Sequence, residues 1–343
     1  MIQVINPVEY QNWNDLLLSL PGYSFFHTAE WAQLLQNTYH YKPSYFVDLE
    51  NGQLKSVLPV MIVDSFLTGK RGVSLPFSDY CEPLLSDPDR FRAVMDHIIN
   101  FGSTDGWKYW ELRGGKEYLS NEPASESFRG HILDLTCGAE RVFRNLRNST
   151  KRNIQKARKE GLTTLIACSQ GAINSFYHLN SLTRKKHGLP SQPYLFFRNL
   201  YKNIIAPGKG FVSLALYQDK IIAAAVFILF GKKAIYKYGA SDEQYSQLRA
   251  NNLVMWQAIE HCCAIGYETL CLGRTDLDHE GLRQFKNGWN VKEYNIHYYR
   301  YSFAEDRFNK ANHRAYALGS KYMRRLPAPI LNFVGRVTYR HIG

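Results

Sequence analysis

The chain has 343 residues, of which 45% are hydrophobic and 14% are aromatic. This composition excludes an intrinsically disordered chain, and the length indicates two domains or one domain built from two similar halves. The formal net charge of +12 predicts attraction to an anionic partner: phosphates, nucleic acid, an acidic carrier protein or an anionic lipid surface.

The N-terminal residues MIQVINPVEYQNW contain neither a basic nor an apolar leader segment, so no secretory signal is expected. The longest apolar run, residues 221–230, is about half as long as a bilayer-spanning helix requires. The six cysteines show no C-x-x-C pair and no spacing of the zinc type, which predicts reduced structural thiols and no metal site. We therefore expect a cytoplasmic protein.

Two stretches predict the same order of elements: a hairpin, a strand, a helix and a strand. The first begins with a hairpin around Asn51-Gly52 and continues through a helical segment, residues 89–102, to GWKYWELRGG. The second begins with a hairpin around residues 218–220 and continues through a helical segment, residues 252–266, to the strand in GYETLCLGRT. This repetition predicts an internal duplication in an α+β protein, in which each half is a mixed sheet flanked by helices.

A basic segment, residues 139–161, separates the two stretches. It contains eight lysines and arginines but only two acidic residues. Ser149 or Thr150 is expected to cap a short helix that ends at Gly161. A solvated surface helix is the ordinary interpretation of a charge run, but the near absence of acidic residues favours a cationic binding face that includes Arg152.

A second basic cluster is expected at the C-terminus of a helix that begins near Phe176 and ends near Gly188. Its members are Arg184, Lys185, Lys186 and His187. The helix dipole accounts for one or two cations at such a position. Four in succession favour anion binding in addition.

The C-terminal stretch KYMRRLPAPILNFVGRVTYRHIG mixes basic and apolar residues. A packed terminal helix is the ordinary expectation, and contact with an anionic membrane surface is the alternative. The predicted organisation is an N-terminal half over residues 1–135, a C-terminal half over residues 136–305 and a basic tail over residues 306–343.

The sequence lacks the motifs of several common enzyme classes. It has no G-x-S-x-G elbow, no P-loop, no H-E-x-x-H and no G-x-G-x-x-G, so hydrolases, NTPases, metalloproteases and dinucleotide-binding enzymes lose their usual support. Chemistry by positioning and by cations remains. Transfer of an activated acyl group to an amine is such a reaction, because its tetrahedral intermediate needs hydrogen-bond donors or a cation near the oxyanion.

The stretch from YKYGASDEQYSQLRANN to GLRQFKNGWN resembles the FemAB-like branch of the GNAT-type acyltransferases. HTAEWAQLL and STKRNIQKARKEG also resemble that family, so the resemblance spans about residues 25–300. It implies two tandem GNAT-like halves, of which the C-terminal half carries a Phe-Lys motif. The matching residues are Tyr236 or Tyr238, Gly239, Ala240, Ser241, Asn251 or Asn252, Trp256, Ala258, Ile259, Gly266, Gly273, Phe285 and Lys286.

The resemblance also implies roles for particular residues. Lys286 would stabilise charge on the acyl oxygen or the leaving group, and Arg184 would lie near the phosphates of an acidic substrate. Arg152 and Lys185 are further candidates for anion binding. Tyr238 and Asn252 are candidates for lining the cleft, with core packing and helix capping as their structural alternatives.

Better-known members of the family transfer an amino acid from aminoacyl-tRNA to the stem-peptide amine of a peptidoglycan precursor. Two departures argue against that assignment here, since no lysine follows Trp31 in WAQLLQN and no charged helical hairpin for tRNA is present. The GNAT pyrophosphate loop is absent as well, so acetyl-CoA has no support from a motif.

We therefore expect an N-acyltransferase that acts on an amine of an anionic, nucleotide- or lipid-linked precursor of the cell envelope or of an exopolysaccharide. No bound cofactor and no covalent enzyme intermediate are expected, and the donor stays open among acyl-CoA, an acyl carrier protein and aminoacyl-tRNA. The alternatives are a peptidoglycan-type aminoacyltransferase and, from another class, a non-catalytic nucleic-acid-binding protein. A location at the inner face of the membrane is the alternative to the free cytoplasm.

Overall fold

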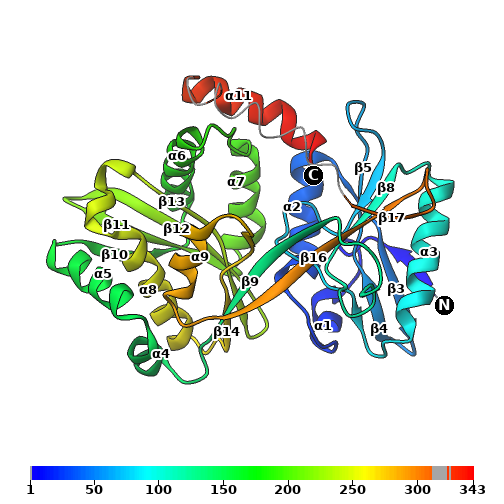
Figure 1. Ribbon diagram of the computed structural model, residues 1–343, viewed down its shortest axis with the longest axis horizontal. Helices are drawn as coiled ribbons and strands as arrows, with labels where there is room; N and C mark the ends of the chain where they lie inside the picture. Colours follow the sequence, from blue (N-terminus) through cyan, green and yellow to red (C-terminus); the bar gives the residue numbers. More distant parts are fainter. Residues whose placement is uncertain (1, 311–322, 324–325) are drawn as a thin grey trace. The chain divides into compact units, whose positions relative to one another are not determined.

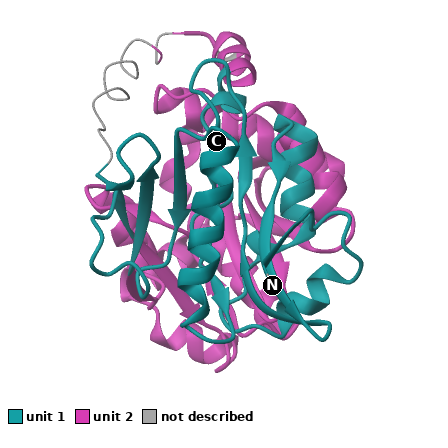
Figure 2. Ribbon diagram, turned by 90° about the vertical axis from the view of Figure 1, so that its right-hand side faces the viewer, with its two compact units in different colours: residues 1–128, 295–313, 338–343 teal, residues 129–294, 314–337 magenta. Residues whose placement is uncertain are grey.

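Figure 1 shows the computed structural model of the chain, which describes residues 2–310, 323 and 326–343. The chain forms two compact units, coloured separately in Figure 2: unit 1 comprises residues 1–128, 295–313 and 338–343, and unit 2 comprises residues 129–294 and 314–337. This division differs from the predicted boundaries at residues 135 and 305. Residues 295–302 join unit 1 because β16 (Lys292–Ser302) pairs there with β8 (Tyr109–Arg113). The predicted tail is divided between the two units.

The strands of unit 1 form two groups. One has the order β1 (Ile2–Ile5), β3 (Tyr45–Glu50), β4 (Gln53–Leu58), β7 (Leu84–Leu85), and the other has the order β2 (Lys42–Pro43), β5 (Met61–Val63), β6 (Arg71–Val73), β8, β16. A short strand, β17 (Arg307–Asn309), pairs with β16. The hairpin predicted around Asn51-Gly52 is the β3–β4 connection, where both residues have the positive φ that a tight hairpin turn requires.

The helices of unit 1 are α1 (Trp13–Leu18), α2 (Ala29–Tyr39) and α3 (Arg90–Thr104), with short 3-10 turns η1 (Phe25–His27) and η4 (Tyr339–His341). Helix α3 corresponds to the predicted helical segment 89–102. It connects the β6–β7 region to β8, and β6 and β8 pair in parallel. The core of this unit includes Phe46, Ile98 and Trp110.

A buried ion cluster lies within unit 1. The carboxylate of Glu111 accepts hydrogen bonds from Arg113 Nε at 3.0 Å and from Arg300 NH2 at 2.6 Å. Burial alone would raise the pKa of Glu111, but the two guanidinium groups outweigh it and lower that pKa to about 2.

The sheet of unit 2 has the order β10 (Thr163–Ala167), β11 (Gly210–Tyr217), β12 (Lys220–Phe230), β13 (Lys233–Ser241), β14 (Thr269–Cys271), β9 (Glu126–Asp134). A two-residue strand, β15 (Thr275–Asp276), pairs with β9. The second predicted hairpin is the β11–β12 connection, in which Gln218 and Asp219 have positive φ. The apolar run 221–230 is the central strand β12, which is buried on both faces and therefore reads as continuously hydrophobic.

Helices cover both faces of this sheet (Figure 1). Ala223, Ala225 and Phe227 of β12 pack with α8 (Ala250–Ala264) and its neighbours α4 (Ala139–Asn145) and α5 (Asn148–Lys159). The other face carries α6 (Gln170–Lys186) and α7 (Tyr194–Leu200), followed by the π-helical turn η2 (Tyr201–Ile205). Two further helices of the described part of the chain are α9 (Glu280–Asn287) and α11 (Ala328–Thr338), and a 3-10 segment, η3 (Glu243–Leu248), lies between β13 and α8.

Two of the predicted helix boundaries are wrong. Helix α5 begins at Asn148 with Arg147 at its N-cap, and the N–H of Arg147 donates to the Gly288 carbonyl. Thr150 is thereby a buried helical residue and not a cap. Helix α6 begins six residues before Phe176, where the Ser169 side chain caps it. The predicted ends at Gly161 and Gly188 are confirmed, since both have positive φ.

The internal duplication is confirmed by the order and pairing of the elements. In each unit a hairpin precedes a strand, and that strand pairs in parallel with the strand that follows the next long helix: β6 with β8 around α3, and β13 with β14 around α8. Parallel neighbours need such a helical crossover. No helix in the described part of the chain is long and apolar enough to span a membrane.

Candidate functional site

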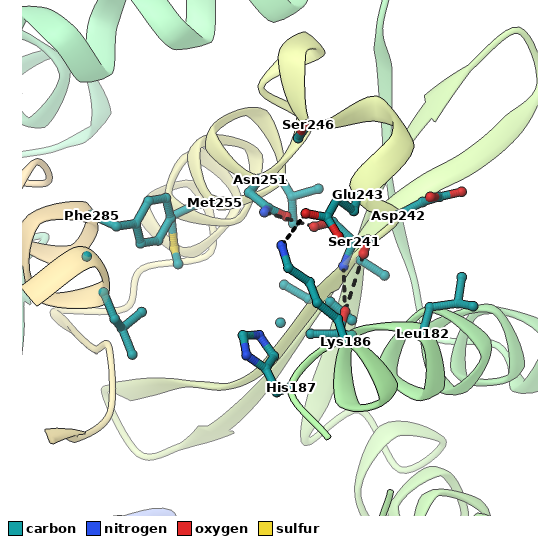
Figure 3. A pocket seen from close by; sticks show the side chains of 18 of the residues that line it. Leu182, Lys186, His187, Ser241, Asp242, Glu243, Ser246, Asn251, Met255 and Phe285 are labelled. Atoms are coloured by element: carbon teal, nitrogen blue, oxygen red, sulfur yellow. Dashed lines mark hydrogen bonds and ion pairs between the residues drawn. The ribbon is translucent and has the colours of Figure 1, made fainter. Parts of the chain in front are cut away.

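A cavity of about 880 Å³ lies within unit 2 (Figure 3). It is bounded by the C-terminal turn of α6, by strands β12 and β13, by the 3-10 segment η3 (Glu243–Leu248), by the first turns of α8 and by α9. Its apolar lining comes mainly from Ala224, Ala225, Val254, Met255 and Phe285. Its polar lining includes Thr183, Lys186, His187, Tyr236, Ser241, Asp242, Glu243, Asn251 and His279.

The cavity exists because two strands of the sheet part. β13 pairs with β14 only through Lys233, Ala234 and Ile235, and it then continues to Ser241 without that neighbour. α9 lies along the opening that this separation leaves. Next to the opening, the β12–β13 register shifts at Phe227, so one extra residue of β13 forms a bulge.

Gly239 is required where the bulge ends. A Cβ atom at this position would overlap the hydroxyl group of Tyr236, which therefore lies over the glycine inside the cavity. Burial raises the pKa of Tyr236 to about 12. The phenol is neutral at pH 7, as at its ordinary pKa, and can donate a hydrogen bond.

Hydrogen bonds hold the end of β13 to its two neighbouring helices (Figure 3). The Asn251 amide donates to Ser241 Oγ at 3.0 Å, and Thr183 Oγ1 both donates to the Ser241 carbonyl and accepts from the Ser241 N–H. At the rim, Lys186 Nζ lies 2.6 Å from the Glu243 carboxylate, and both side chains are largely exposed. An ion pair in such a solvated position contributes little to stability, so a charged ligand can replace either partner.

A smaller cavity of about 230 Å³ adjoins the start of α8. Arg249 precedes the helix with a φ of 61°, and no side chain caps the first turn. The free N–H groups of a helix N-terminus favour an anion, because they coincide with the positive end of the helix dipole. Asn252, predicted to line the cleft, is a wall residue of this smaller cavity and the third residue of the helix, so it is not the N-cap.

Lys286 lies on α9 and is 3% exposed. Its Nζ donates to the carbonyl oxygens of Gly273 at 3.0 Å and Arg274 at 2.8 Å, which follow β14. The preceding residue, Phe285, lines the large cavity, whereas Lys286 does not. The structure thus shows a rigidly held ammonium group behind the cavity wall, and its catalytic role stays a prediction.

The segment around Lys286 is the helix α9. His279 caps this helix by accepting the Leu282 N–H at its Nδ1. Phe285 and Trp289 are in edge-to-face contact at 5.9 Å, and Trp289 is fully buried, so the two rings anchor the end of this helix by packing.

The other predicted site residues lie apart from the cavity lining. Tyr238 packs against Phe176, Phe196 and Phe197 on the α6–α7 face of the sheet. Arg184 Nε donates to the Pro190 carbonyl, Lys185 is partly buried on α6, and Arg152 is exposed on α5. Their proposed binding roles stay predictions.

Sequence reasoning missed several lining residues. Lys186 belongs to the basic cluster that the sequence singled out, and its spacing of three from Thr183 places both on one side of α6. Tyr236 was one of the two tyrosines matching the family pattern. For Glu243 and His279 the sequence contains no signal, because only the fold brings them to the same cavity as α6.

The comparisons with known proteins agree with this architecture. Residues 144–287 match the family model of the GNAT acetyltransferase domain. The crystal structure of FemX superposes with a TM-score of 0.69 at 13% sequence identity, covering 87% of this chain and 96% of FemX. No curated protein sequence matches this chain significantly.

Two further solved structures have the same fold. A tandem GNAT protein from the clavulanic acid biosynthesis pathway gives a TM-score of 0.55 at 9% identity, covering 88% of this chain and 98% of its own. L-PGS from Bacillus licheniformis gives 0.53 at 10% identity, covering 90% and 94%. The predicted fold of two tandem GNAT-like halves is therefore confirmed.

Proposed function

Because this chain carries a GNAT acetyltransferase domain within a FemAB-like tandem fold, we propose that it is an N-acyltransferase. It would transfer an acyl or aminoacyl group to an amine of an anionic, nucleotide- or lipid-linked precursor of the cell envelope or of an exopolysaccharide. The observation that carries the proposal is the cavity beside the part of β13 that extends past its pairing with β14; the cavity lies next to the N-terminus of α8. The cavity can take an extended acyl arm, and the helix N-terminus can take an anion.

The donor must match both the cavity, which takes an acyl arm, and the N-terminus of α8, which takes an anion. Acyl-CoA, an acyl carrier protein and aminoacyl-tRNA all present an activated acyl group on an arm that also bears phosphate. In the proposed complex the phosphate lies at the first turn of α8, near Arg249, and the arm enters the large cavity. The exposed cations of α5 lie in the same unit and suit the acidic surface of a carrier protein or an RNA backbone.

The proposed reaction is a direct displacement. The acceptor ammonium first gives one proton to solvent at the exposed rim, and the free amine then attacks the acyl carbon to form a tetrahedral intermediate. As the bond from the acyl carbon to the leaving oxygen or sulfur breaks, the second proton of the attacking nitrogen passes to that leaving atom. Tyr236, whose hydroxyl group lies in the cavity, donates a hydrogen bond to the developing anion. Glu243 holds the ammonium form of the acceptor at the rim, and Lys186 binds its anionic group.

In this proposal Lys286 also stabilises the negative charge of the intermediate, although it does not touch the substrate. Its ammonium group is fixed by two backbone carbonyls, so it supplies a positive potential behind the cavity wall. A peptidoglycan-type aminoacyltransferase is the second candidate. The FemX fold, which covers 87% of the chain, favours it over a nucleic-acid-binding protein.

The test supplies purified protein with an amine acceptor and each donor class in turn, and follows amide formation by mass spectrometry. Ligands that co-purify with the protein guide the choice of acceptor. Tyr236→Phe should lower kcat by about tenfold or more with little change in KM, since one donor to the transition state is lost. Tyr217→Phe, which alters a tyrosine on β11 outside the cavity, is the matched control.

Two results would count against the proposal. Equal kcat for Tyr236→Phe and wild type would remove the assigned role of the phenol. The second result is that no donor is consumed while the protein binds RNA or DNA with an affinity that falls with salt. If Lys151→Glu and Arg152→Glu also abolish this binding, the protein is a non-catalytic nucleic-acid-binding protein and not an enzyme.

A further inference from the structure

Helix α11 (Ala328–Thr338) has one face that packs against unit 2. Leu331 is buried on this face, and Gly335 lies so close to the loop between α6 and α7 that a Cβ atom would overlap the Ser191 carbonyl oxygen. The helix is therefore seated on the protein through a close backbone approach. This contact decides which side of α11 faces outward.

The outward face of α11 is apolar. Ile330 is 46% exposed, Phe333 62% and Val337 46%. Spacings of three and four residues place these side chains on one stripe along the helix, about 10 Å long at 1.5 Å per residue. Single exposed apolar residues are common on protein surfaces, but an aligned set containing an exposed phenylalanine indicates a surface that binds something.

The sequence that contains this stripe carries charges of one sign. Residues 307–343 contain eight lysines and arginines and no aspartate or glutamate. Arg336, exposed on α11, borders the stripe, and Arg340 is exposed just beyond the helix. A ligand for this face must accept apolar side chains and supply negative charge beside them.

A second copy of the chain fits these requirements poorly. A symmetric contact through the stripe would bring the two copies of Arg336 close together, and the segment contains no carboxylate to compensate them. The surface of an anionic phospholipid bilayer supplies both an apolar layer and a dense negative charge. An eleven-residue helix is too short to cross the bilayer and lies in the interface plane.

We propose that α11 docks unit 2 on the surface of an anionic phospholipid membrane, with Ile330, Phe333 and Val337 in the acyl–headgroup boundary and Arg336 on the headgroups. This membrane site is separate from the acyl-transfer cavity and does not depend on the proposed reaction. It would place the enzyme where a lipid-linked substrate could reach it.

The experiment is co-sedimentation of the purified full chain with vesicles. One set is pure phosphatidylcholine, and the other contains about one third phosphatidylglycerol. The wild type should partition onto the anionic vesicles only, and added salt should weaken its binding. Phe333→Ser should lower the partition coefficient onto anionic vesicles by about tenfold, and Arg336→Glu should lower it by a similar factor.

Leu165→Ser is the matched control, because Leu165 is 51% exposed on β10 and lies outside the stripe. It should bind vesicles like the wild type. Each variant is checked by circular dichroism and thermal unfolding, and the exposed position of Phe333 makes a folded variant the expected result. Equal binding of wild type and Phe333→Ser, or no preference for anionic vesicles, would overturn the proposal. Light scattering that shows a dimer dissociated by Phe333→Ser would overturn it in favour of a second copy.

Discussion

Replacement of Lys286 by methionine should destabilise unit 2 in the absence of any substrate. The side chain is 3% exposed, and its ammonium group donates to two backbone carbonyls that follow β14. Methionine keeps much of the apolar stem but donates no hydrogen bond. The carbonyl oxygens of Gly273 and Arg274 would then lose a partner, and the connection from β14 to α9 would loosen.

The size of the effect follows from these two bonds. A hydrogen bond to a charged group contributes about 1.5–3 kcal/mol, while removal of a buried charge restores part of its desolvation cost. We therefore expect the free energy of unfolding to fall by about 3 kcal/mol. For a unit of this size that corresponds to a decrease in Tm of about 6–12 °C.

The assay is thermal unfolding followed by circular dichroism, with acyl transfer measured well below the Tm of the variant. Lys292→Met is the control, because Lys292 is exposed at the start of β16 and its loss should change stability by no more than about 0.5 kcal/mol. A change at Lys286 as small as that of the control would refute the structural role. If stability falls as expected but activity at low temperature is unchanged, the electrostatic contribution proposed for Lys286 is wrong.

Three other substitutions test separate parts of the structure. Gly239→Ala should displace the Tyr236 hydroxyl and weaken donor binding by about tenfold in a calorimetric titration, whereas Gly281→Ala, which has open space at its Cβ in the same cavity, should bind normally. Glu111→Gln should lower the stability of unit 1 at neutral pH by about 3 kcal/mol, because it leaves the guanidinium groups of Arg113 and Arg300, which are 12% and 30% exposed, with a weaker acceptor. The pKa of this carboxyl is depressed from 4.5 to about 2, so the wild type should lose its contribution as pH falls through that interval, and denaturation curves of the variant should vary less there. Tyr238→Leu should reduce the Tm through lost aromatic packing while leaving KM unchanged, and an altered KM would show that this tyrosine does reach a substrate.

Local patterns explain the predictions that succeeded. The two hairpins were predictable because their turn residues adopt positive φ between apolar runs, and the ends of α5 and α6 were predictable because Gly161 and Gly188 allow the chain to leave a helix. The duplication followed from the repeated order of such local elements. Each of these signals depends on residues close together in the sequence.

The errors occurred where distant residues decide the conformation. At the start of α5 the N–H of Arg147 donates to the carbonyl of Gly288, a long-range contact that no local capping rule contains. Tyr238 and Tyr236 are two residues apart, and a bulge between them assigns one to the α6–α7 packing and the other to the cavity. The alternation of an undisturbed strand would have placed both on the same face.

The amino-acid sequence by itself determined that this is an α+β chain of two similar halves, with a strongly basic surface and a Phe-Lys motif after its last parallel strand. Those properties depend on turn chemistry, periodicity and composition. The tertiary structure alone decided that Lys286 is buried against two carbonyls, that Glu243 meets Lys186 at a cavity rim, and that α11 turns Phe333 outward. Such contacts depend on where the pairing of β13 with β14 ends and on how closely α11 approaches the loop between α6 and α7. Both are set by packing between residues far apart in the chain.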